Sequence, residues 1–232
     1  YVSLSGLDES LEEGIKLFEH ILANVKPNQE AFENGVADKL KDRADTKLNK
    51  QAILYGGLMN YGMYGAISPI KNILNEGELK ALDPNNLVEK IKELTSYEHY
   101  IYYYGRKEIK DVVALLNENH KTPETLKPLI AAKEFPALTM ESNKVYFVNY
   151  DMVQSEVMML SNAGNYNKDI AATTNVFNQY FGGGLSSIVF QEIRESKALA
   201  YSAYAAYTTP RKLDQPHYIR AYVGTQVDKL TD

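Results

Sequence analysis

An arginine and a tyrosine seven residues apart are the side chains of this sequence with the clearest capacity for chemistry. Arg194 and Tyr201 lie in FGGGLSSIVFQEIRESKALAYS, residues 181–202. Arginine offers fixed N–H donors for peptide carbonyls, and a tyrosine hydroxyl can donate to a developing oxyanion. The alternative is structural, with a buried tyrosine and a surface ion pair from Arg194 to Glu192 or Glu195. Residue spacing alone favours this structural interpretation, because most such residues serve packing.

The elements around this pair predict how it is positioned. Gly182, Gly183 and Gly184 permit backbone angles closed to other residues and allow another chain to approach closely. A helix is predicted from about Ser187 to Ser196, with Val189, Phe190 and Ile193 on one face and Arg194 at its edge. An arginine there can bury its stem while its guanidinium reaches a groove. A short turn then leads to Tyr201 at the start of a strand, so both side chains can enter one cleft.

Two other catalytic interpretations of the glycine loop have little support. A serine nucleophile would need a Gly-x-Ser-x-Gly turn, which is absent, and Ser186 and Ser187 stand where helix caps would. A phosphate site is suggested by glycines before a helix, because the backbone amides there attract anions. The lysine of a phosphate-binding loop is missing, however, and a glycine cluster alone is a weak signal.

The four histidines do not form a zinc motif. They are His20, His99, His120 and His217, and two of them follow a glutamate, in KLFEH and TSYEH. A His-x-x-Glu-His helix would place two imidazoles on one face for zinc, but the first histidine is missing in both segments. We therefore expect no zinc bound by this chain alone.

Composition bounds the remaining function classes. The sequence has 232 residues, a net charge of -5, 44% hydrophobic and 24% charged residues, and no cysteine. The acidic balance lacks the basic footprint of a nucleic-acid binder. No apolar run approaches the roughly 18 residues that predict a membrane span. Without cysteine, disulfides and thiolate metal sites are excluded.

The periodicity of apolar residues predicts an α+β chain in two parts. Helices are expected over residues 11–22, from 28 onward, over 86–96, 108–120 and 168–181. Strands are expected over residues 99–106, 144–150, 154–162, 201–209 and 217–226, the last two paired antiparallel. A proline-rich segment, 123–143, predicts a linker between a first domain (1–122) and a second domain (144–232).

The stretch from Asp169 to Ser202 closely resembles the insulinase (pitrilysin-type) zinc metallopeptidase family. The shared residues include FGGGLSS, FQEIRE and LAYS. KVYFVNYDMVQSEVMML resembles the strands that open a family domain, and HYIYYYGRKEIKDVVALLNENH resembles the strand and helix that close one. The resemblance implies two related α/β-roll domains, antiparallel-rich sheets packed against helices, both incomplete here. They would belong to the C-terminal half of a protein whose two halves enclose a chamber.

The resemblance also implies roles for the named residues. Tyr201 would contact the scissile carbonyl and stabilise its oxyanion, Arg194 would hold the substrate backbone, and the glycines at 182–184 would contact substrate. Zinc would be bound outside this chain, by an N-terminal half or a partner subunit. The intact protein would be an endopeptidase for unstructured peptides, and this fragment alone would be inactive. Family members that no longer cleave keep two alternatives open: a non-catalytic assembly subunit and a peptide-binding module.

Overall fold

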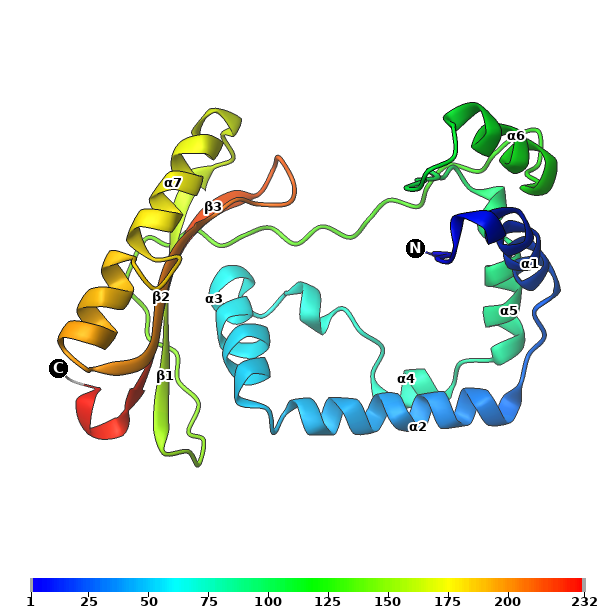
Figure 1. The fold of residues 1–232 in the computed structure, drawn as a ribbon. Coiled ribbons are helices and arrows are strands. Elements are labelled where there is room, and N and C mark those ends of the chain that lie inside the picture. The colour runs from blue at the N-terminus through cyan, green and yellow to red at the C-terminus, as the bar shows by residue number, and fades with distance from the viewer. Residues whose placement is uncertain (1, 231–232) are drawn as a thin grey trace. The chain divides into compact units, whose positions relative to one another are not determined.

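The computed structural model of this chain describes residues 2–230, which divide into two compact units (Figure 1). One unit combines the residues up to 41 with 74–133, and the other combines 42–73 with 134 onward. Helices and antiparallel strands both occur, which confirms the predicted α+β class. The predicted division into two insulinase-like domains around a 123–143 linker stays a prediction.

The first unit is helical. Its helices are α1 (Leu11–Asn24), most of α2 (Gln29–Thr46), α4 (Glu76–Lys80), α5 (Pro84–Lys92) and α6 (Ile109–Asn119), with 3-10 turns at Asp8–Ser10 and Leu94–Ser96. Ile15, Val88 and Val112 are buried where α1 packs against α5 and α6. Asp83 caps α5 by accepting a hydrogen bond from the Asn85 amide at 2.8 Å. The apolar stripes predicted for these helices therefore form the small core of this unit.

The second unit is built on a three-stranded antiparallel sheet. Strands β1 (Gln154–Asn165), β2 (Ala200–Thr208) and β3 (Pro216–Gln226) lie in the order β1-β3-β2. The predicted pairing of the last two strands is confirmed. Its helices are α7 (Ala171–Phe181), α3 (Asn60–Tyr64) and two π-helices, η2 (Ala52–Met59) and η6 (Phe190–Ser196). Short 3-10 turns lie at Pro69–Lys71, Lys168–Ile170 and Val227–Lys229.

Helices cover both faces of this sheet. Helices α7 and η6 pack against β2 and bury the small side chains of Ala203 and Ala205, whereas η2 packs at β1 (Figure 1). On the η2 side, the rings of Tyr55 and Tyr204 each stack on Tyr222, and the hydroxyls of Tyr55 and Tyr204 lie 2.8 Å apart. Small residues on one face and aromatic residues on the other thus fix which helix each face of the sheet accepts.

Two predicted strands, 99–106 and 144–150, are wrong. Both segments lack regular structure, and their apolar side chains are exposed, among them Tyr102, Tyr104, Val145 and Phe147. Strand-forming residues need a hydrogen-bonded neighbour, and within residues 2–230 no strand pairs with either segment. The nearest substitute is one isolated parallel bridge between Tyr97 and Lys127.

Candidate functional site

The loop after α7 is held by close backbone packing at its first two glycines. A Cβ atom added to Gly182 would lie 2.1 Å from the Ala205 carbonyl oxygen, and one added to Gly183 would lie 2.6 Å from that of Asn178. A Cβ at Gly184 would meet open space. Packing therefore requires glycine at the first two positions, whereas the third faces an open region where a ligand could approach.

One of the two serines after the glycines caps the helix that contains η6, as the sequence predicted. The hydroxyl oxygen of Ser187, a fully buried residue, accepts a hydrogen bond from the Phe190 amide at 3.4 Å. The Gln191 side-chain amide donates to the Leu185 carbonyl at 2.6 Å and closes the loop onto the helix. The first contact satisfies a helix N–H that would otherwise be unpaired, and the second satisfies a loop carbonyl, so the N-terminal end of η6 is fixed.

The far end of η6 is irregular. Its π-helical hydrogen bonding ends with a bond from the Lys197 amide to the Glu192 carbonyl at 3.1 Å. Ala198 then takes a positive φ of 50°, and the Leu199 amide donates back to the Ile193 carbonyl at 3.0 Å. This left-handed stop usually carries glycine, so an alanine here costs about 1 kcal/mol.

A β-bulge places Tyr201. Ala200 opposes Thr225 and Ser202 opposes Gly224, so β2 has one residue more than β3 between these pairs, and that residue is Tyr201. Bulges of this kind redirect a side chain and are over-represented beside active sites. The bulge leaves Tyr201 74% exposed, which differs from the buried tyrosine of the structural interpretation.

Arg194 and Tyr201, the two predicted site residues, lie together. The guanidinium carbon of Arg194 is 5.0 Å from the centroid of the Tyr201 ring and 4.8 Å from that of Phe190. The ion pair expected of a structural arginine is also present, between the Arg194 Nε and a Glu195 oxygen at 3.5 Å. An exposed pair at that distance contributes little, so the two rings are the better determinants of where the guanidinium lies.

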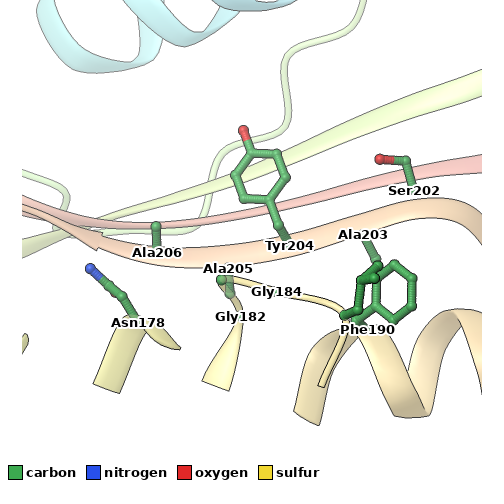
Figure 2. Close-up of a pocket in the computed structure, with 11 residues that line it drawn as sticks. Asn178, Gly182, Gly184, Phe190, Ser202, Ala203, Tyr204, Ala205 and Ala206 are labelled. Carbon is green, nitrogen blue, oxygen red and sulfur yellow. The ribbon is translucent and has the colours of Figure 1, made fainter. Parts of the chain in front are cut away.

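An open cavity of about 470 Å³ adjoins this cluster and is drawn in Figure 2. Its wall contains the three glycines and Leu185, Phe190 and the β2 residues from Ser202 to Ala206. Phe190 therefore borders the cavity with its ring and also stacks on Arg194. Figure 2 shows Tyr204 and Ser202 on the opposite side of β2 from Phe190. The cavity thus has mainly backbone and small or apolar side chains in its wall.

Asn178, which sequence reasoning missed, protects the free edge of β2 beside this cavity. Its side-chain amide donates to the Tyr207 carbonyl at 2.9 Å and accepts from the Tyr207 amide at 2.7 Å. The Gly182 carbonyl accepts from the Ala205 amide at 3.4 Å. Together they replace part of a neighbouring strand on an edge that would otherwise be unpaired. No motif marks an asparagine for this role, because it depends on the three-dimensional position of α7.

Neither a metal centre nor a membrane span is found in the part of the chain that the structure describes. Across residues 2–230, no three metal-binding side chains gather around one point. No helix within the same range combines the length and apolarity that crossing a membrane requires.

A three-stranded antiparallel sheet with helices on both faces, and an Arg–Tyr cluster behind a glycine loop, describe an α+β domain. The sequence profile of the peptidase M16 inactive domain matches residues 99–232, more than half of the chain. The chain therefore belongs to the peptidase M16 family, through its inactive domain, and the predicted resemblance to insulinase-type peptidases is confirmed. Among curated protein sequences, none matches this chain.

Several solved structures share this fold at low sequence identity. A protease from Helicobacter pylori has a TM-score of 0.66 and 14% identity over 94% of this chain and 53% of its own. A peptidase M16 inactive domain from Pseudomonas fluorescens has a TM-score of 0.64 and 16% identity, over 94% of this chain and 52% of its own. A mutant of the ferredoxin protease FusC, in complex with Arabidopsis ferredoxin, has a TM-score of 0.68 and 11% identity, over 96% of this chain and 24% of its own. This chain thus spans about half the length of the first two structures and about a quarter of the length of the third.

Proposed function

We propose that this chain is the substrate-binding part of a zinc-dependent endopeptidase, and that the zinc is bound outside it. Its family domain is the non-catalytic one, and the described residues do not fit a zinc site. An N-terminal half or a partner subunit would hold the metal, and unstructured peptides would be cleaved in a chamber between the parts. The chain alone would then bind peptide without cleaving it.

The arrangement of Arg194 beside an exposed Tyr201 carries this proposal. Two rings position the guanidinium, and its side chain keeps 36% of its surface exposed. Its N–H groups can therefore donate to carbonyls of an extended peptide. The Tyr201 hydroxyl would donate to the carbonyl whose oxygen gains negative charge during cleavage. Losing one such donor lowers kcat by about 10²–10³-fold in other enzymes. Gly184 would contact the bound backbone, together with the constrained Gly182 and Gly183.

The test is turnover of a flexible fluorogenic peptide by the full-length, zinc-loaded protein and its Tyr201→Phe variant. We expect kcat to fall by about 10²-fold with little change in peptide Kd, because the lost donor acts mainly on the transition state. Tyr180→Phe is the matched control, since Tyr180 is also an exposed tyrosine of this unit. Equal kcat in wild type and Tyr201→Phe would refute the role of Tyr201.

The second candidate is a peptide-binding module or assembly subunit that cleaves nothing, and the match to an inactive domain favours it. Absence of turnover by the wild-type full-length protein would exclude the peptidase. Peptide affinity, measured by fluorescence anisotropy, then separates the remaining two: a module loses affinity in Arg194→Ala, whereas an assembly subunit has no affinity to lose.

A further inference from the structure

Two histidines and a glutamate form a hydrogen-bonded chain in the first unit, outside the site described above. The Nε2 atoms of His99 and His120 lie 2.8 Å apart. The other ring nitrogen of His99 is 2.6 Å from the Tyr97 carbonyl oxygen, and that of His120 is 2.7 Å from a Glu19 carboxylate oxygen. His120 and Glu19 are mostly buried, with side chains 15% and 19% exposed.

The acceptors at both ends fix the number of protons on the two rings. A carbonyl oxygen only accepts, so the Nδ1 of His99 carries hydrogen, and the ionised Glu19 requires the same of the His120 Nδ1. With both Nδ1 atoms protonated, two neutral rings would point the lone pairs of their Nε2 atoms at each other across 2.8 Å. One more proton must lie between them. The pair therefore holds three N–H hydrogens on two rings and carries one positive charge.

The geometry fits a proton better than a metal ion. The ring centroids are 5.0 Å apart with the two Nε2 atoms between them, so the rings meet nearly head-on. A zinc ion between head-on imidazoles would need these nitrogens about 4 Å apart, at about 2 Å from each. A hydrogen bond needs the observed separation.

We propose that His99 and His120 share a single proton, and that this proton fastens the segment at Tyr97–His99 and the end of α6 to α1. His120 follows α6 directly, and its amide still bonds to the Leu116 carbonyl at 2.7 Å. Glu19 belongs to α1. The contact links three segments that are distant in sequence, so its protonation state governs how stably these segments stay packed against one another.

Several of the charged and titratable groups around this histidine pair contact other partners instead of the two rings. From α1 the group facing it is Glu19, and its neighbour His20 bonds instead to Asn24 at 3.2 Å. Next to His120 along the chain, Lys121 donates to the Asn117 carbonyl at 3.3 Å. Beside the His99 segment, the Lys127 ammonium lies over the Tyr97 ring at 5.4 Å. Glu118 and Glu98 flank the two histidines in sequence.

A shared proton predicts a stability maximum rather than a single transition. The closed pair binds one proton, whereas two free imidazoles bind two protons well below pH 6.5 and none well above it. The His99–His120 contact is therefore weakened both below and above about pH 6.5. Its stability rises with pH where the open state binds more protons than the closed state, and falls with pH where the open state binds fewer. The opening constant should increase up to about tenfold per pH unit on each side of about pH 6.5.

Two substitutions isolate the alkaline side. In His99→Gln no second lone pair faces the His120 Nε2, so His120 needs only its Nδ1 hydrogen and the closed state needs no extra proton. In His120→Gln the same holds for His99. In both variants the alkaline-side increase should therefore disappear, and the acid-side increase should remain because the open state still binds one proton at low pH. His20→Gln, which removes a histidine outside this hydrogen-bonded cluster, should keep both the acid-side and the alkaline-side increase of the opening constant.

The experiment uses the full-length protein and follows hydrogen exchange of α6 amides between pH 5 and 8, corrected for intrinsic exchange rates. Nitrogen NMR of ¹⁵N-histidine-labelled protein counts the N–H hydrogens on the two rings. We expect three hydrogens near neutral pH in the wild type, and loss of the alkaline-side increase in both His99→Gln and His120→Gln. Two neutral rings, or a wild-type opening constant without a minimum, would overturn the proposal, as would identical pH profiles for His99→Gln and His20→Gln.

Discussion

Replacing Gly182 by alanine tests whether the glycine loop is held by packing. The added methyl would lie 2.1 Å from the Ala205 carbonyl oxygen and 2.5 Å from the Ala205 nitrogen. Ordinary contacts begin more than about 1 Å further out. Both atoms belong to the backbone of β2, so no side chain can rotate away, and loop and strand must separate. The hydrogen bond from the Ala205 amide to the Gly182 carbonyl would be lost with this movement.

The expected loss of unfolding free energy is about 3 kcal/mol. Overpacking costs about 1–3 kcal/mol, and a lost backbone hydrogen bond adds about 1 kcal/mol. No backbone term is added, since the φ of -142° at Gly182 is negative and does not itself require glycine. Urea denaturation of the full-length protein, followed by tyrosine fluorescence, measures the change.

Gly184→Ala is the matched control, because a Cβ there meets nothing within 4 Å. We expect its unfolding free energy to stay within about 0.5 kcal/mol of wild type. Equal stability of the Gly182 and Gly184 variants would refute the packing argument. The same pair separates stability from binding: if only Gly184→Ala weakens peptide affinity without loss of stability, the third glycine is the one that contacts substrate.

Three further changes test other parts of the second unit. Ala198→Gly should raise the unfolding free energy by about 0.5–1 kcal/mol in urea denaturation, because glycine takes the positive φ of 50° without strain. Phe190→Leu removes one ring from the Arg194 guanidinium and should weaken peptide binding about two- to fivefold, with unchanged affinity contradicting the stacking role. Burial and then the hydrogen bond to Tyr204 raise the pKa of Tyr55, so its contribution is present below the unfolded value of about 10 and is lost as pH rises further. The urea midpoint should therefore fall above about pH 10, and less steeply in Tyr55→Phe; parallel pH profiles would contradict this.

The sequence predicted regular elements well wherever a local pattern sufficed. The apolar stripe of α1, the serine cap before η6 and the β2–β3 pair all follow from spacing and residue type within one short segment. The strands expected at 99–106 and 144–150 failed for a different reason. Their residue types favour strands, but a strand exists only with a neighbour, and no spacing rule supplies one.

The sequence indicated that Arg194 and Tyr201 could lie together, but not the geometry that brings them together. The seven-residue spacing of Arg194 and Tyr201 indicates a helix end and a strand start, and both occur. It does not reveal the π-turn, the positive φ of Ala198 or the bulge, since each depends on how η6 meets the sheet edge. The His99–His120 contact was likewise invisible, because 21 residues and a helix separate the two rings.

These irregularities bear on what the site is for. A tyrosine kept for stability would bury its ring, yet Tyr201 is 74% exposed and lies at a bulge. An arginine kept for a surface ion pair would need no neighbouring rings, yet the Arg194 guanidinium carbon lies within 5.0 Å of the centroids of two. The π-turn and the left-handed alanine lower stability without burying either side chain. A ligand that both groups contact, as proposed above for a peptide, would give this arrangement a use that packing does not.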